Sequence, residues 1–361
     1  MADDNGLRAA IEAVEDPLLG RCLGDLQMVS IAEKRRLGSD KLTVAVPVPN
    51  YPVIDELKSR IQLALDGVGS DAEITVEVMD DAGREAMMSG LREGAPPRVG
   101  ETGSRTRVIA VSSGKGGVGK SSVTTNLAVS LVGKGHSVGV IDGDIWGFSI
   151  PRMLGISDPP IVIEQSIVPP VAHGVKAMSM DYFVPDDKAV IWRGPMLHKA
   201  IEQFLQDVWW DDPEFLIVDM PPGTGDIAIS MSQFLPRAQV LLVTTPQPTA
   251  QRVAKRAALM AAQVNQEVMG VVENMSWFTG DDAKQYEIFG AGGGQALADD
   301  LGVPLMARIP LLPAMREGAD SGDPVSVAAP KSESAAAFET LADAVVAKKP
   351  RVRTHPELVI R

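Results

Sequence analysis

Hydrophobic runs separated by polar, helix-forming stretches predict alternating strands and helices through most of the chain after about residue 105. Apolar runs of strand length lie near Val108, Val138, Val175, Phe215, Val240, Val268 and Pro304. Stretches of helical character follow Ser121, Pro195, Asp226, Thr249 and Gly292. Because alternating strand and helix units build mostly parallel sheets, we expect an α/β fold with helices flanking both faces of the sheet.

A shorter and different pattern precedes this region. It predicts helices from about Gly6 to Val14 and from Ile54 to Leu65, and strands at residues 41–48 and 73–78. Residues 92–104 are rich in Pro, Gly and polar residues, which is typical of a linker. We therefore expect a small α+β domain at 1–91, a linker at 92–104, the large α/β domain at 105–347 and a basic tail at 348–361. We interpret the tail as a solvated end rather than a binding arm.

The segment from Gly114 to Ser121 reads G-x-x-x-x-G-K-S and directly follows a predicted strand. Glycines let several backbone N–H groups converge on phosphate oxygens, while the lysine reaches the β- and γ-phosphates and the serine hydroxyl ligates Mg²⁺. A helix beginning after the loop would direct its positive end at the anion. The loop predicts a P-loop nucleotide-binding site. Its expected ligand-binding residues are Gly114, Lys115, Gly116, Gly117, Val118, Gly119, Lys120, Ser121 and Ser122.

Two other predicted strands end in aspartates. One is the apolar run 215–218 followed by Asp219, and the other leads into Asp142-Gly-Asp144. Asp219 at the end of its strand is placed to hold the Mg²⁺ shell together with Ser121. Phosphoryl transfer depends mainly on positioning and charge neutralisation, which carboxylates and Lys120 supply. We therefore expect Asp142, Asp144 and Asp219 to lie at the nucleotide site.

The second lysine of the loop, Lys115, is further from its own phosphates than Lys120 is. One interpretation is that it contacts a phosphate bound by a partner subunit, which implies a homodimer with nucleotide between the subunits. The other is that Lys115 is a solvated loop residue. Spacing alone leaves both open.

Composition narrows the function classes. A net charge of -13 and a pI near 4.9 argue against a nucleic-acid-binding surface, which needs clustered Lys and Arg. No apolar run approaches the ~18 residues of a membrane span, and the first residues are acidic, so we expect a cytoplasmic protein without a membrane partner. One cysteine, Cys22, rules out an internal disulfide framework. The four histidines are scattered and receive no role.

Taken together, four segments resemble the Mrp-type iron–sulfur cluster carrier ATPases, deviant Walker A proteins related to MinD and ParA. The segments are Gly114–Ser121, Asp142–Asp144, Asp219–Asp226 and Gly270–Ser276. The resemblance extends from Arg105 to about Val346, with further matches at Asp142–Pro151 and Trp192–Met196. The N-terminal region is similar to the small domain often fused ahead of Mrp proteins and also found alone in iron–sulfur assembly factors.

This resemblance implies slow hydrolysis of ATP by a homodimer that serves apo-iron–sulfur proteins or assembly factors. In this family Asp144 orients the attacking water and Asp142 supports the site. Asn274 matches the position that hydrogen-bonds adenine, although an asparagine there could instead stabilise its own turn. Arg193 and Lys199 match positions near the dimer face, and a solvated location explains them nearly as well.

One departure from the family pattern concerns the cluster. Family members carry a Cys-x-x-Cys between the Asn-Met-Ser and Ile-Phe-Gly segments, and two subunits pool these thiolates around a [4Fe–4S] cluster. Here Trp277–Phe289 contains no cysteine, and Asp281 and Asp282 are hard oxygen donors. The N-terminal domain likewise has Tyr51 where its relatives commonly have a cysteine. Because such clusters normally need four thiolates, direct carriage is doubtful.

Two functional hypotheses remain open on the sequence. The first is an ATPase of iron–sulfur cluster assembly and transfer. The second is a nucleotide-switched dimeric binding protein of the MinD/ParA kind that holds no cluster. The extent of the resemblance favours the first, and the cysteine count favours the second.

Overall fold

The computed structural model of the chain describes residues 4–32, 41–93, 95–144, 147, 149–183, 194–223 and 233–350. The chain forms two compact units. The first comprises residues 1–97, 158–171 and 207–211, and the second comprises 98–157, 172–206 and 212–361. The first unit therefore includes two short segments from later in the chain.

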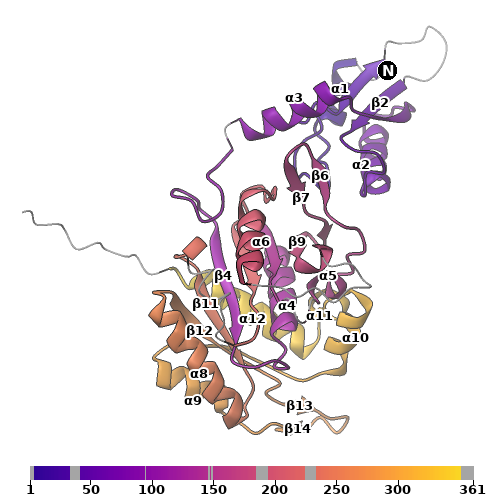
Figure 1. Cartoon of the computed structure of the whole chain (residues 1–361). Helices are drawn as coiled ribbons and strands as arrows, with labels where there is room; N and C mark the ends of the chain where they lie inside the picture. The colour runs from indigo at the N-terminus through magenta and orange to yellow at the C-terminus, as the bar shows by residue number, and fades with distance from the viewer. Residues whose placement is uncertain are drawn as a thin grey trace, which may run out of the picture. The chain divides into compact units, whose positions relative to one another are not determined.

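An eight-stranded sheet organises the second unit, and four of its strands, β4, β9, β11 and β12, are labelled in Figure 1. The strand order is β15-β12-β11-β4-β10-β5-β9-β8. All neighbours from β15 to β9 pair in parallel, which confirms the predicted mostly parallel α/β fold. The strands are β4 (Arg107–Ser113), β5 (Val138–Asp142), β8 (Val171–Ala172), β9 (Val175–Ser179), β10 (Phe215–Asp219), β11 (Gln239–Thr244), β12 (Glu267–Asn274) and β15 (Leu305–Ile309).

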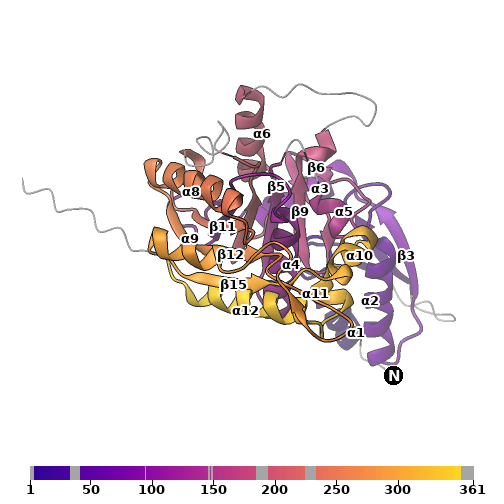
Figure 2. The ribbon, with the colours of Figure 1, turned by 90° about the horizontal axis from the view of Figure 1, so that it is seen from below.

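Helices cover both faces of this sheet (Figure 2). Helix α4 packs against α12, while α8 lies on β11 and α9 on β12. From β4 the chain crosses the sheet toward β5, and from β11 it crosses in the opposite direction, toward β12. Because connections between parallel strands are right-handed, α4 and α8 lie on opposite faces. The helices are α4 (Lys120–Gly133), α5 (Ile150–Met153), α6 (Gly194–Gln206), α8 (Pro248–Gln263), α9 (Gly293–Leu301), α10 (Pro313–Ser321), α11 (Val325–Ala328), α12 (Glu333–Ala347) and the 3₁₀ turn η1 (Met180–Phe183).

The first unit is a small α+β structure with its own apolar core. Strand β2 (Lys41–Val46) pairs antiparallel with β1 (Val29–Ala32) and parallel with β3 (Glu73–Val78). Its helices are α1 (Asp4–Glu12), α2 (Ile54–Gly67) and α3 (Asp81–Arg92), and its hairpin consists of β6 (Ile161–Ile163) and β7 (Ser166–Val168).

Several elements differ from the sequence predictions. Strand β2 ends at Val46 rather than residue 48, where Pro47 follows and has no N–H to donate to the ladder. Helix α3 was not predicted, although Asp80 caps it by accepting a hydrogen bond from the Gly83 amide. The helix predicted after Asp226 begins in residues outside those described.

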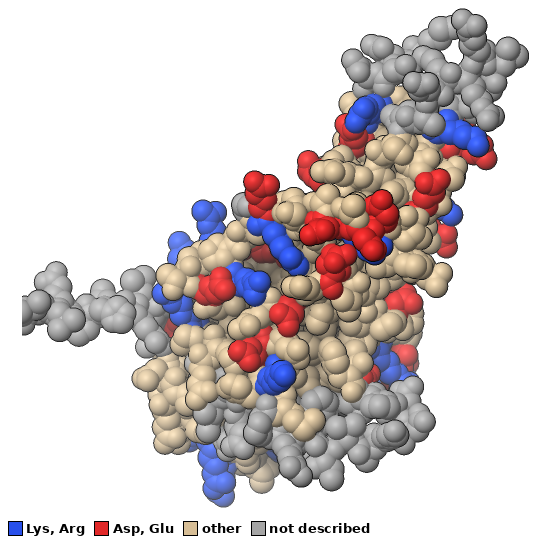
Figure 3. Space-filling view, turned by 45° about the horizontal axis from the view of Figure 1, so that its top comes forward, with Lys and Arg blue, Asp and Glu red and all other residues tan. Residues whose placement is uncertain are grey.

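The molecular surface carries both charge signs. Over the described residues, Lys and Arg are interspersed with Asp and Glu on the face shown in Figure 3. Among the described residues, no helix combines the length and the apolar character needed to cross a membrane.

Candidate functional site

The P-loop joins the end of β4 to the start of α4, which begins at Lys120. Gly119 has a φ of +80°, and a Cβ there would collide with the Asn274 amide, so glycine is required for both conformation and space. At Gly116 and Gly117, in contrast, an added Cβ would meet nothing within 4 Å. The middle of the loop therefore leaves its backbone open to a ligand at the positive end of α4.

Asp219 is the centre of the site. It is fully buried at the end of β10, and its Oδ2 accepts hydrogen bonds from Lys120 Nζ at 2.6 Å and Ser121 Oγ at 2.7 Å. Its Oδ1 accepts from Thr124 Oγ1 at 2.8 Å. Thr124 was not singled out in the sequence, but it lies one turn after Lys120 on the same helix face. The helix thus presents a lysine and two hydroxyls to one carboxylate.

Asp142 is also fully buried and organises the segment that follows it. Its Oδ1 accepts from the Asp144 amide at 3.3 Å. Its Oδ2 accepts from the amides of Ser149 and Ile150, at 3.1 and 3.2 Å, and from Ser179 Oγ at 3.2 Å. The carboxylate therefore holds the start of α5 and the end of β9 beside the P-loop.

The pKa of Asp142 is raised to about 7. Burial is the larger cause, and the negative charge of Asp219 is the second. The two aspartates are register partners on the adjacent strands β5 and β10, which explains their proximity. Hydrogen bonds from Ser149 and Ile150 oppose this increase in pKa.

A pH dependence of stability follows for the nucleotide-free protein. Because the folded chain binds a proton at Asp142 more tightly than the unfolded chain does, raising the pH from 4 to 7 removes stability, by roughly 1 kcal/mol per pH unit. The loss ends above the folded-state pKa. Asp142→Asn removes the group that binds this proton. The unfolding free energy of the wild type should therefore fall relative to that of the variant between pH 4 and 7. Denaturant unfolding at each pH measures it, and parallel pH profiles would contradict it.

Asp144 completes the carboxylate group around Lys120. Its Oδ2 lies 3.5 Å from Lys120 Nζ, and the residue is 9% exposed. The structure thus brings Lys120, Ser121, Asp142, Asp144 and Asp219 together at the carboxyl ends of β4, β5 and β10, where open α/β sheets bind ligands.

Two other predicted residues make contacts that the sequence did not indicate. Lys115 Nζ donates to Gln247 Oε1, at 3.2 Å, next to the start of α8. Asn274 is 2% exposed, and its Nδ2 donates to the Val118 carbonyl at 2.9 Å, so the amide supports the P-loop. Its Oδ1 has no hydrogen-bond partner among the described residues.

Three further residues, Ser122, Lys199 and Arg193, were predicted at the P-loop or near a dimer face. Ser122 follows Ser121 in the first turn of α4, and its carbonyl accepts from Asn126 Nδ2. Lys199 is exposed on α6, and Arg193 lies outside the described residues.

The donors at this site fit Mg²⁺. This ion takes oxygen ligands and is usually bound by one or two carboxylates together with substrate phosphates and water. Hydrogen bonds from Ser121 and Thr124 to Asp219 bring three side chains with oxygen atoms together. No cluster of three or more His, Cys, Asp or Glu suited to a metal occurs in the described part of the chain.

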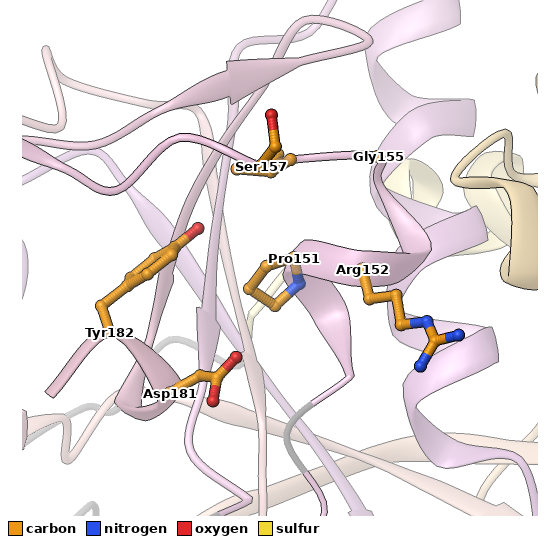
Figure 4. Close-up of a pocket in the computed structure, with 7 residues that line it drawn as sticks. Pro151, Arg152, Gly155, Ser157, Asp181 and Tyr182 are labelled. Atoms are coloured by element: carbon orange, nitrogen blue, oxygen red, sulfur yellow. The ribbon is translucent and has the colours of Figure 1, made fainter. Parts of the chain in front are cut away.

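A cavity of about 480 Å³ lies beside the segment that Asp142 holds (Figure 4). The Asp181 amide donates to Ser179 Oγ, which in turn donates to Asp142. Both η1 and α5, which line the cavity, are therefore connected to Asp142. Its lining residues are Pro151, Arg152, Gly155, Ile156, Ser157, Asp181 and Tyr182.

The segment that lacks the expected cysteines forms a closed hairpin of β13 (Phe278–Thr279) and β14 (Gln285–Tyr286). Tyr286 Oη donates to Asp282 Oδ2 at 2.9 Å across its turn. Glu333 at the start of α12 accepts from Trp277, Thr279 and Gln285. These side chains offer only oxygen and nitrogen atoms, which already form hydrogen bonds with one another. Iron–sulfur clusters are held by thiolates, so this hairpin does not fit a cluster.

Glu273, which the sequence reasoning missed, orders the chain just before this hairpin. It is fully buried and accepts from Ser276 Oγ at 2.9 Å, the Gly294 amide at 2.5 Å and Arg308 Nε at 3.0 Å. It thereby connects the end of β12 to the first turn of α9. The sole cysteine, Cys22, belongs to the first unit and is half-buried.

Comparison with known proteins gives a consistent picture. The profile of the ParA-type family described as NUBPL iron-transfer P-loop NTPase matches residues 104–346. An iron-sulfur cluster carrier protein of Mycobacterium tuberculosis is 42% identical, covering 95% of this chain and 93% of the relative. One of Bacillus subtilis is 37% identical, covering 86% and 89% respectively.

Solved structures resemble the chain over a smaller share. A nucleotide-binding protein from Archaeoglobus fulgidus in complex with ADP is 32% identical with a TM-score of 0.54, covering 60% of this chain and 86% of that one. The cell division ATPase MinD of Pyrococcus furiosus is 26% identical with a TM-score of 0.52, covering 66% and 98%.

Proposed function

Because this chain belongs to the ParA-related NUBPL iron-transfer P-loop NTPases, we propose that it binds and slowly hydrolyses Mg²⁺·ATP to drive iron–sulfur cluster assembly and transfer to apoproteins. The observation that carries the proposal is the convergence of Lys120, Ser121 and Thr124 on the buried Asp219. The relatives named as cluster carriers, which align with 95% and 86% of the chain, support the pathway.

Each side chain has a role in this proposal. Lys120 moves its charge from Asp219 to the β- and γ-phosphates when ATP binds. Asp144, beside Lys120, orients the attacking water, and Asp142 keeps the following segment in place through its amide contacts. Asp219 and Ser121 would hold Mg²⁺, and the bound ion would supply positive charge beside the phosphate oxygens. Asn274 positions the P-loop and faces the adenine.

The functional unit in this proposal is a homodimer with Lys115 reaching the partner's phosphates. Lys115→Ala in an Asp144→Ala background is then expected to reduce the ATP-dependent dimer fraction strongly, because a charge-assisted phosphate contact is lost. Light scattering with and without ATP measures this. The control is Lys134→Ala, which removes a lysine that pairs with Asp343 at the far end of α4. Dimers that persist undiminished without Lys115 would rule out the trans contact.

The cluster is cargo in this proposal, and the hairpin of β13 and β14 does not hold it. We expect anaerobic reconstitution with iron and sulfide to leave no stable [4Fe–4S] cluster, since a homodimer has two cysteines and a cluster normally needs four thiolates. Gly280→Cys with Ala283→Cys restores a Cys-x-x-Cys and serves as a gain-of-function comparison. Four irons per dimer in the wild type, lost on Cys22→Ser, would contradict the expectation.

The pathway has a separate test. Cells without this chain should have reduced activity of iron–sulfur enzymes, which the wild type restores and Lys120→Ala does not. Normal enzyme activities in those cells would favour the second candidate, a nucleotide-switched binding protein without a cluster. The closed, thiol-free hairpin is the observation that favours that candidate.

A further inference from the structure

The first unit is completed by segments that lie far from it in sequence. The hairpin of β6 and β7 and residues 207–211 belong to this unit together with residues 1–97. Ile163 and Val168, one on each strand of the hairpin, are both fully buried. They belong to the same apolar core as Leu57 and Ile61 of α2.

Alternation along β6 shows which face of the hairpin enters this core. Ile163 is 0% exposed, whereas the preceding Val162 is 60% exposed. Adjacent strand residues point to opposite faces, so one face of the hairpin is buried and the other is open. Fully burying an aliphatic side chain contributes roughly 1.5–3 kcal/mol, which makes the hairpin an important part of the unit's stability.

Polar contacts surround the apolar ones. Helix α3, next to the hairpin in Figure 1, supplies two arginines. Arg84 Nε lies 3.4 Å from Glu164 Oε1, and Arg92 Nη2 donates to Ser166 Oγ at 3.0 Å. Arg21 Nη2 donates to Asp211 Oδ1 at 2.5 Å. Arginines on α3 and in the loop between α1 and β1 thus contact both of the inserted segments.

The inserted segments also contact each other. The Ile167 amide donates to the Asp207 carbonyl and the Trp209 amide to the Ile167 carbonyl, both at 2.8 Å. Backbone hydrogen bonds therefore join residues 207–209 to the hairpin as one small surface. Trp209 packs at the edge of the same core.

We propose that residues 158–171 and 207–211 form a dedicated binding surface for a small α+β domain, and that residues 4–93 of this chain are its occupant. The linker then serves as a tether, while the attachment itself is noncovalent. The surface defines the kind of partner that fits it. Such a partner has an open apolar core that Ile163 and Val168 can close. It also carries arginines that can pair with Glu164 and Asp211.

Cleavage of the folded, full-length chain tests the proposal. A specific protease sequence replaces residues 95–104, and the protein is cut after purification. The two pieces are expected to elute together on size exclusion at micromolar concentration. Pieces that separate, while the larger one still binds nucleotide, would overturn the proposal.

Variants locate the attachment on the hairpin. Ile163→Asp should release the N-terminal piece after cleavage, with at least ~100-fold weaker association because a charge enters an apolar core. Val162→Asp, on the exposed face of the same strand, should not. Nucleotide binding by the larger piece reports whether each variant is folded. If Ile163→Asp does not fold, the double variant Ile163→Ala with Val168→Ala replaces it. If this double variant retains the N-terminal piece as well as Val162→Ala does, the hairpin is not the site of attachment and the proposal is overturned.

Discussion

Lys120→Ala is expected to abolish nucleotide binding, with at least ~100-fold weaker affinity, because the lysine supplies the charge that neutralises the β- and γ-phosphates. The variant should also change the nucleotide-free protein. Lys120 is 6% exposed and pairs with a fully buried Asp219, and removing one partner of a buried ion pair costs about 3–5 kcal/mol. Calorimetric titration with Mg²⁺·ATP and thermal unfolding measure the two effects.

The control for this experiment is Lys134→Ala. Lys134 follows the last turn of the same helix and pairs with the exposed Asp343, so the change removes a surface ion pair worth little. It should leave affinity and melting temperature nearly unchanged. Lys120→Ala protein that is folded and binds ATP like the wild type would contradict the assignment of the P-loop lysine.

Asp144→Ala is expected to keep ATP binding and to slow hydrolysis by at least ~100-fold, a typical loss when a group that positions the reacting water is removed. The carboxylate of Asp142 holds α5 and β9, whereas that of Asp144 approaches Lys120 at 3.5 Å. The fold should therefore tolerate truncation of Asp144 better than truncation of Asp142. Phosphate release in single-turnover conditions, with affinity measured separately, distinguishes binding from hydrolysis.

A matched control is Asp158→Ala, which removes an exposed aspartate further along the chain. Its rate should equal that of the wild type. If Asp144→Ala hydrolyses ATP at the wild-type rate, the water-orienting role belongs to another group. If it loses binding instead, Asp144 acts through Lys120 and not on the water.

That the P-loop and the strand-end aspartates lie together could be predicted largely from the sequence. The P-loop is a contiguous segment whose chemistry depends on local residue types, and a strand before it and a helix after it are readable from apolar periodicity. Asp142 and Asp219 were found because each directly follows an apolar run. Parallel strands end at one edge of a sheet, so strand-end aspartates were expected at the same place.

The contacts between distant segments were decided by tertiary structure. Only the strand order places β5 beside β10, which brings Asp142 next to Asp219 and raises its pKa. Only the packing of β12 behind the P-loop gives Asn274 the Val118 carbonyl as a partner. These contacts depend on which strands become neighbours, and no local pattern encodes that.

The hairpin of β6 and β7 is the clearest example of a contact that only the tertiary structure decided. Its short strands, separated from the N-terminal region by the P-loop and β5, gave no reason to assign them to that region. Their burial with α2 and contact with α3 appear only in three dimensions. The sequence by itself therefore determined the residue types of the proposed nucleotide site, because the P-loop and the strand-end aspartates are local patterns. Tertiary structure determined which segments complete the first unit, because a shared apolar core depends on shape and burial rather than on sequence proximity.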